Sequence, residues 1–184
     1  RRAEKLLERG LKEADRQRAA DTAHAADDAQ FALRWSKDGK RYVEIEEDIL
    51  AGVPEDQWVK TVMDTLRDRF KDGIPVGNSM IQVTRKTRKE WSGSKDTGRL
   101  RFFDKLAYAD KMRASGSADE IVQASGNYVN EEPTHIRKDG TVDFSRGTVL
   151  VSIGGNDYEA KVITGSNKDG SVFLYDMLSM TPTS

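Results

Sequence analysis

The chain lacks cysteine altogether. This absence excludes disulfide bonds, catalysis by a thiolate and zinc sites built on cysteine, while it leaves the cellular compartment open. Histidine is nearly as scarce, because His24 and His135 are the two copies in 184 residues. They form no His-x-x-x-His spacing, and the one histidine of the compact part does not build a zinc site by itself. We therefore expect no metal ion and no other cofactor.

The chain also lacks any hydrophobic run near the ~20 residues that cross a bilayer, so we expect no membrane partner. Neither sign of charge dominates, since 30 basic residues stand against 31 acidic ones. This balance excludes a nucleic-acid binder that is basic over its whole surface, although a local basic face stays open. The length allows one hydrophobic core and an appendage. A first residue of Arg1 in place of methionine indicates a piece of a longer protein.

Residues 1–30 form the predicted appendage. They are rich in alanine and charge, and Leu6, Leu7 and Leu11 supply only a short apolar stripe. A helix that is polar all round is a spacer or docks onto another protein. We therefore predict a helical linker over 1–30 and one folded domain over 31–184.

The first half of the predicted domain contains both strand and helix patterns. Residues 31–45 have the pattern of a hairpin with a turn at Asp38-Gly39. Pro54 opens a helix whose apolar positions recur at helical spacing over 58–70. Residues 74–84 resume a strand pattern, and Pro75 favours an edge position for that strand. These patterns indicate an α+β domain.

Three strand-like segments follow one another near the end of the chain, at 148–153, 158–164 and 171–177. Gly154-Gly155 and Asp169-Gly170 supply turn chemistry between them. A meander of this kind packs one face on a core and can leave the other open to a ligand. We predict helices packed on an antiparallel sheet of four to five strands. We expect its core to contain four widely spaced apolar residues: Trp58, Phe103, Ile121 and Val149.

A basic segment covers residues 84–113, where ten basic residues stand against four acidic ones. Within it, residues 92–98 have the composition of a flexible loop and residues 100–114 that of a helix. Charge-rich helices are commonly solvated faces with internal ion pairs. The alternative is a wall that binds phosphate groups. The candidate phosphate binders in this segment are Arg85, Arg88 and Lys95.

Metal-free cleavage of RNA is the chemistry that the candidate residues support. A histidine of near-neutral pKa moves a proton to or from an attacking 2′-hydroxyl or a leaving 5′-oxygen. Arginine and lysine stabilise the charge that builds on the phosphoryl oxygens. His135 stands beside Arg137 and Lys138 in a predicted loop that enters the sheet. The remaining candidates are one guanidinium and three hydroxyls on or after the strands: Arg146, Tyr158, Thr164 and Thr181.

From about Tyr42 to Ser184 the chain resembles a domain found at the C-terminal ends of phage and prophage polyvalent or head-morphogenesis (MuF-type) proteins. Short motifs carry this resemblance along the chain. They are Asp48-Ile49-Leu50-Ala51-Gly52-Val53, Thr87-Arg88-Lys89-Glu90 with Ser94-Lys95, Ala109-Asp110-Lys111-Met112-Arg113-Ala114, Asp119-Glu120-Ile121-Val122-Gln123-Ala124-Ser125, His135-Ile136-Arg137-Lys138-Asp139, Phe144-Ser145-Arg146-Gly147, Ile153-Gly154-Gly155-Asn156-Asp157-Tyr158, Leu174-Tyr175-Asp176 and Thr181-Pro182-Thr183. Trp91-Ser92-Gly93 departs from the bulkier and more basic continuation expected of such a domain.

Such domains are similar to the predicted nucleases grouped with barnase, EndoU, the ribonuclease colicins and RelE, in which helices pack on a four-stranded antiparallel sheet. The resemblance implies a metal-independent ribonuclease toxin that acts in the cytoplasm of a bacterial host. It further implies RNA, including tRNA, as substrate, a cognate immunity protein as partner, and fusion to a phage structural or delivery protein. It favours His135 as acid or base, Arg88 and Arg146 as phosphate binders, and Tyr158 and Thr181 as positioning groups.

Two other functions fit parts of the sequence. A non-catalytic module that binds nucleic acid or a capsid would use the same basic segment without cleavage, and its affinity would fall with salt. ADP-ribosyltransferase toxins occupy the same position in related proteins. Those toxins use an arginine, a Ser-Thr-Ser motif and a Glu-x-Glu motif, in that order along the chain and on strands. This chain has no such set on strands, because Glu44-Ile45-Glu46 matches the Glu-x-Glu spacing but comes before the other predicted strands. We therefore rank this third function below the other two.

Overall fold

The computed structural model describes residues 33–35, 41–131 and 141–183. Contacts divide the chain after Leu33, and residues 34–184 form one compact unit. The helix predicted over 1–30 lies outside the described residues.

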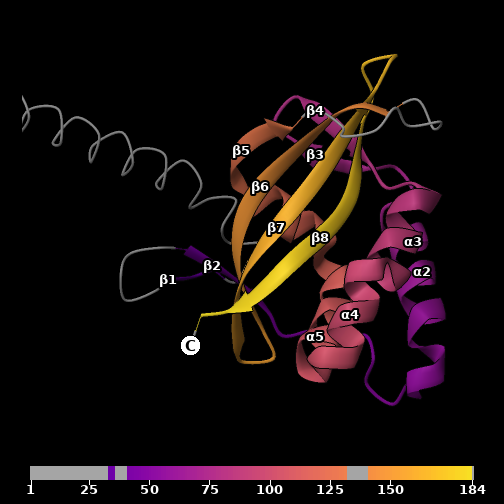
Figure 1. Cartoon of the computed structure of the whole chain (residues 1–184), viewed down its shortest axis with the longest axis vertical. Helices are drawn as coiled ribbons and strands as arrows, with labels where there is room; N and C mark the ends of the chain where they lie inside the picture. The colour runs from indigo at the N-terminus through magenta and orange to yellow at the C-terminus, as the bar shows by residue number, and fades with distance from the viewer. Residues whose placement is uncertain (1–32, 36–40, 132–140, 184) are drawn as a thin grey trace, which may run out of the picture. The chain divides into compact units, whose positions relative to one another are not determined.

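The described chain is an α+β structure, in agreement with the predicted class (Figure 1). Two strands come first, β1 (Leu33–Trp35) and β2 (Arg41–Ile45). A short 3₁₀ turn, η1 (Glu55–Gln57), leads into α2 (Trp58–Arg69), and a hairpin of β3 (Ile74–Val76) and β4 (Ser79–Gln82) follows. The helical part then comprises α3 (Arg85–Gly93), α4 (Lys95–Phe103), α5 (Lys105–Ala114), the 3₁₀ turn η2 (Ser115–Ser117) and α6 (Ala118–Ala124). The last strands are β5 (Gly126–Glu131), β6 (Thr141–Ile153), β7 (Asn156–Asn167) and β8 (Val172–Pro182).

The sheet is mixed, with the order β1-β2-β6-β7-β8-β4-β3 and with β5 also paired to β6. The predicted antiparallel meander is present as β6, β7 and β8. However, β2 runs parallel to β6 and β4 runs parallel to β8, so the expectation of an antiparallel sheet is wrong at these two pairings. Parallel neighbours need a long crossover, and the helical part of the chain supplies it in both cases.

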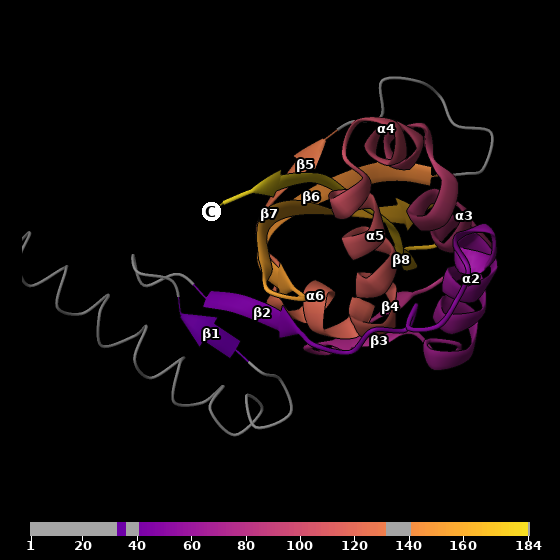
Figure 2. The same cartoon turned by 90° about the horizontal axis from the view of Figure 1, so that it is seen from below.

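The sheet curls around α5 and α6, which Figure 2 shows lying inside its curve. Val62 and Leu66 of α2, at helical spacing, are completely buried, as the apolar pattern predicted. Pro75 lies on β3 at the end of the sheet order, as expected, but the single strand predicted over 74–84 is wrong, because these residues form the hairpin of β3 and β4 and β4 lies between β3 and β8. Gly154 and Gly155 both have positive φ in the turn between β6 and β7, where glycine avoids a steric cost.

Two of the four predicted core residues are in the core. Ile121 and Val149 are buried. Trp58 is only half-buried, and its indole nitrogen donates to the Val53 carbonyl at 2.9 Å. Phe103 is 80% exposed, so its predicted place in the core is wrong. The helix expected over 100–114 is broken at Asp104, and this break leaves Phe103 on the surface at the end of α4.

The basic segment folds into three capped helices. The side chains of Thr84, Ser94 and Asp104 accept hydrogen bonds from the backbone N–H groups three residues later, at 3.3, 3.1 and 3.0 Å. Such N-caps satisfy N–H groups that have no partner within the helix. Residues 92–98 are therefore the end of α3, the cap at Ser94 and the start of α4, and the expectation of a flexible loop there is wrong.

Candidate functional site

A cleft of about 480 Å³ opens between α4 and β8. Its lining contains three cations, one carboxylate, two hydroxyls and four apolar side chains. The residues are Arg99, Lys111 and Arg146; Asp96; Ser179 and Thr181; and Leu100, Phe103, Met177 and Met180. A hollow with more than one cation and with hydroxyl groups suits a phosphate-bearing ligand.

One face of α4 forms the helical wall of the cleft. Asp96, Arg99, Leu100 and Phe103 follow the spacing that places side chains on the same side of a helix. Arg101 lies off this face, where it pairs with Glu55 at 3.7 Å and sits over the ring of Tyr108 at 5.8 Å. No hydrogen bond or ion pair joins the Arg99 side chain to another described residue. Its guanidinium is therefore available for a ligand in the cleft.

A bulge in β8 shapes the opposite wall. Lys161 pairs with Leu178 and Glu159 pairs with Thr181, so Ser179 and Met180 together occupy the space of one residue. Ser179 adopts φ 55°, the left-handed region that a residue with a Cβ rarely adopts. Bulges bend a strand and redirect its side chains, and they are frequent beside active sites. Here the bulge coincides with the part of β8 that lines the cleft.

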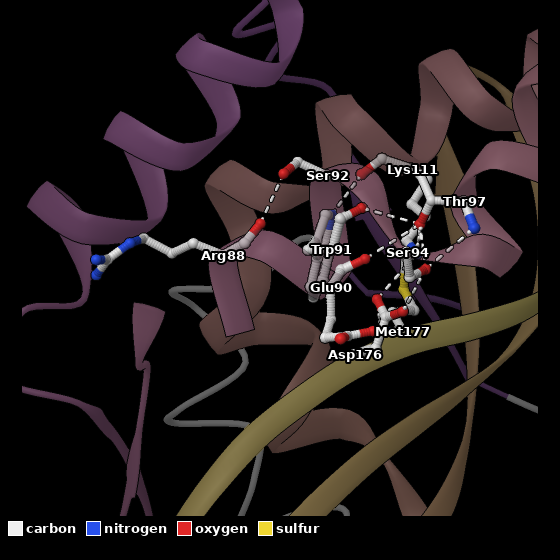
Figure 3. A network of polar contacts seen from close by, with 9 residues as sticks. All are labelled: Arg88, Glu90, Trp91, Ser92, Ser94, Thr97, Lys111, Asp176 and Met177. Carbon is white, nitrogen blue, oxygen red and sulfur yellow. Dashed lines mark hydrogen bonds and ion pairs between the residues drawn. The ribbon is translucent and has the colours of Figure 1, made fainter. Parts of the chain in front are cut away.

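Lys111, one of the residues that line the cleft, belongs to a buried ion pair (Figure 3). Lys111 Nζ lies 2.9 Å from Asp176 Oδ1 and donates to Thr97 Oγ1 at 2.7 Å. Ser94 Oγ donates to Asp176 Oδ2 at 3.3 Å, and the backbone N–H of Met177 donates to Oδ1 at 2.8 Å. Burial raises the pKa of the Asp176 carboxyl to about 6, while the Lys111 ammonium acts in the opposite direction.

This network joins three helices to the last strand. Lys111 lies on α5, Thr97 on α4 and Asp176 on β8, while the Trp91 indole of α3 donates to the Lys111 carbonyl at 2.9 Å. The Thr87 hydroxyl of α3 also donates to the Leu174 carbonyl of β8. Buried polar groups that are fully paired hold their elements in one arrangement. The helical wall of the cleft is therefore fixed relative to the strand wall.

Two of the predicted site residues meet in the cleft. Arg146 on β6 and Thr181 on β8 are both part of its lining and both exposed. The Thr181 hydroxyl donates to the Ser179 carbonyl at 3.3 Å. His135, Arg137 and Lys138 lie outside the described residues, between β5 and β6.

The other predicted site residues lie elsewhere. Arg85 and Lys95 are exposed at the starts of α3 and α4, and neither lines the cleft. Arg88 is half-buried on α3, and in Figure 3 its guanidinium extends away from the Lys111–Asp176 network. Thr164 is buried within β7. The structure therefore does not bring Arg88 to Arg146.

Tyr158 is part of a different network. Its hydroxyl donates to Asp110 Oδ2 at 2.5 Å, and Asn156 donates to the same oxygen at 3.1 Å. Arg113 pairs with the other oxygen of Asp110 at 3.0 Å. Burial, followed by the hydrogen bond to Asp110, raises the pKa of the Tyr158 hydroxyl well above its usual value. This tyrosine connects β7 to α5, and its hydroxyl is already engaged.

Sequence reasoning missed Arg99, Lys111, Ser179 and Phe103 as lining residues. The spacing of Asp96, Arg99 and Phe103 shows that they share one helical face, but it does not show what that face meets. Ser179 carries no local signal, because its bulge arises from the pairing of β7 with β8.

No family model matches this chain, and no curated protein or solved structure shows detectable similarity to it. Among the described residues, no cluster of three or more acidic, histidine or cysteine side chains is arranged to hold a metal ion. In the same part of the chain, no helix is both long enough and apolar enough to cross a membrane.

Proposed function

We propose that the cleft between α4 and β8 binds RNA and that the chain is a metal-independent endoribonuclease. The observation that carries this proposal is the meeting of Arg99 and Arg146 in one cleft. These arginines come from a helix and a strand far apart in the sequence, and the hydroxyls of Ser179 and Thr181 line the same space. Guanidinium groups bind the non-bridging oxygens of a phosphodiester through paired hydrogen bonds.

The proposed reaction uses the substrate's own nucleophile. The 2′-oxygen attacks phosphorus, the bond to the 5′-oxygen breaks, and the products carry a 2′,3′-cyclic phosphate and a 5′-hydroxyl. One group removes the proton from the 2′-hydroxyl and another protonates the leaving oxygen. We assign one of these two proton transfers to His135 on the basis of its sequence context, and the other to water. We assign stabilisation of the phosphoryl charge to Arg99 and Arg146.

The setting that we propose follows the resemblance stated above. The chain would act as a toxin domain of a phage or prophage protein in the cytoplasm of a bacterial host. An immunity protein that covers the cleft would be its natural inhibitor. The toxin role and the immunity protein both depend on the ribonuclease activity, so they are tested only once that activity has been measured.

A binding module without catalysis is the second candidate. Two observations favour it: Arg88 does not line the cleft, and the Tyr158 hydroxyl is held by Asp110. Of the five catalytic residues predicted from the sequence, Arg88 and Tyr158 are therefore not placed to touch a phosphate in the cleft. A binding module would show salt-dependent affinity for RNA and no cleavage.

The test is cleavage of end-labelled RNA by the full chain in the presence of EDTA. We expect products ending in a 2′,3′-cyclic phosphate, and we expect Arg146→Ala and Arg99→Ala each to slow cleavage by about 100-fold. Arg101→Ala is the matched control, because Arg101 lies on the same helix but off the cleft, and it should leave the rate unchanged.

The outcomes separate the two candidates. Loss of cleavage with retained binding in His135→Ala supports the enzyme, whereas binding without cleavage by the unmodified chain selects the binding module. If Arg99→Ala and Arg146→Ala bind and cleave RNA like the unmodified chain, the assignment of the cleft is wrong.

A further inference from the structure

Two neighbouring phenylalanine rings at the end of α4 are unusually exposed. Phe102 is 81% exposed and Phe103 is 80% exposed. Their ring centroids lie 5.0 Å apart with an interplanar angle of 80°, so each ring holds the orientation of the other. Leaving two large apolar side chains in water is unfavourable, because apolar surface is more stable when it is removed from water. A ligand that covers them would recover this free energy.

Phe103 is continuous with the proposed phosphate site. It lines the same cleft as Arg99 and lies four residues after it on the same face of α4. Four residues correspond to about 6 Å along a helix axis. One nucleotide can therefore present its phosphate to Arg99 and its base to the ring of Phe103.

The charges around the two rings favour a polyanion over an apolar protein surface. Arg99 and Lys105 outnumber the one acidic residue, Asp104, on this stretch of α4 and the start of α5, with Arg101 set aside because it lies off the cleft face. Arg101 is partly engaged by Glu55 at 3.7 Å. Asp96 opposes an anion and lies about 4.5 Å along the helix from Arg99 but about 10 Å from Phe103, so it favours a phosphate on the Phe103 side of Arg99.

We propose that Phe103 is a stacking platform for an unpaired base, so that the cleft takes single-stranded RNA rather than duplex. This inference rests on the proposed function and adds the substrate class. In a duplex the faces of the bases are covered by their neighbours, whereas unpaired bases can be splayed onto aromatic rings. Phe102 supports the platform from the side and does not line the cleft.

The test measures binding by fluorescence anisotropy, with a short 2′-O-methyl oligouridine as the probe. This probe has no free 2′-hydroxyl, so it cannot be cleaved by the proposed reaction. We expect Phe103→Ala to weaken binding by about 10-fold, in line with the loss of one base–aromatic stack. Phe103→Trp should restore the affinity, because the indole ring also stacks on a base.

A duplex of the same length and backbone should bind more weakly than the single strand, and Phe103→Ala should leave duplex binding unchanged.

Two variants make the result specific. Leu106→Ala removes another exposed apolar side chain, 55% exposed and outside the cleft, and it should not change the affinity.

Arg146→Ala reports on the proposed function itself. Weakened binding in Arg146→Ala together with unchanged binding in Phe103→Ala overturns the stacking inference and leaves RNA binding intact. Unchanged binding in both variants overturns both proposals. Equal loss of single-strand and duplex binding in Phe103→Ala also overturns the stacking inference.

Discussion

Lys111 and Asp176 form an ion pair of 2.9 Å in which the side chains are 2% and 1% exposed. Each charge is desolvated, and the pair is accompanied by hydrogen bonds from Ser94, from the Met177 backbone and to Thr97. Pairs of this kind are costly to form and far more costly to break, because the remaining partner is left as an isolated buried charge. Lys111 also lines the cleft, and the pair joins α5 to β8.

Lys111→Met should destabilise the fold by about 3–5 kcal/mol, because the Asp176 carboxylate loses its counter-ion. The double variant Lys111→Met with Asp176→Leu should be less destabilised than the sum of the two single variants, since it leaves no uncompensated charge. Urea unfolding of the four proteins gives the interaction energy. An additive double variant would contradict the coupling of these two residues.

Glu120 should make the fold less stable as the pH rises. Burial, followed by the charges of Asp119 and Glu47, raises the pKa of Glu120 to about 7 from an ordinary value of 4.5. The folded chain therefore binds this proton more tightly than the unfolded chain does between these two values. The stabilising contribution is complete below pH 4.5 and is lost as the pH rises through 7.

Glu120→Gln removes the titrating carboxyl and therefore removes this loss of folding stability at high pH. Relative to the unmodified chain, the variant should gain roughly 1 kcal/mol of stability between pH 5 and pH 8, a small value because solvent screens a half-exposed group. Asp64→Asn should lose stability at neutral pH, because the hydrogen bond with Lys60 lowers the pKa of Asp64 and stabilises the fold wherever this carboxyl is ionised. This difference should disappear only as the pH falls below the ordinary value of 3.8. Thermal melts that extend from below pH 3.8 to pH 8 check both signs, and a pH-independent difference for Glu120→Gln would be evidence against the prediction.

Gly165→Ala should destabilise the sheet by about 1–3 kcal/mol through overpacking. Gly165 stands opposite Phe173 in the pairing of β7 with β8, and an added Cβ would lie 2.6 Å from the tip of the Phe173 ring. Phe173 is buried, so its ring has no free space to occupy. Combining Gly165→Ala with Phe173→Leu should cost less than the sum of the single changes, which chemical unfolding can measure. If Gly165→Ala alone is neutral, the ring moves more easily than the packing indicates.

Ser179→Gly should separate stability from ligand binding. The left-handed backbone at Ser179 costs about 1 kcal/mol for a residue with a Cβ, so glycine should raise the free energy of unfolding slightly, by up to about that amount. Ser179→Ala keeps the backbone cost and removes only the hydroxyl. If the hydroxyl contacts RNA, both variants lose affinity equally while only Ser179→Gly gains stability. Melting temperatures and anisotropy on the same samples distinguish these effects.

The local pattern of the chain was sufficient for several elements. Alternating strands separated by Gly154-Gly155 and Asp169-Gly170 predicted the meander of β6, β7 and β8, because turn residues and strand period act over neighbouring positions. The apolar spacing that buries Val62 and Leu66 likewise predicted the inward face of α2. The caps at Thr84, Ser94 and Asp104, which begin three short helices, did not enter the sequence prediction, which therefore expected a loop over 92–98 and one unbroken helix over 100–114.

Tertiary structure decided the features on which the proposed function depends. The sequence shows that Asp96, Arg99 and Phe103 share a helical face, but contact between residues far apart along the chain brought Arg146 and Thr181 to that face. The same contacts placed Lys111 against Asp176 in a dry site, and the register of β7 on β8 forced the bulge at Ser179. Local propensity extends over a few residues, whereas a cleft and a buried ion pair depend on how whole elements pack. The chemical character of this chain is therefore readable from its sequence, and the place where that chemistry converges is set by the fold.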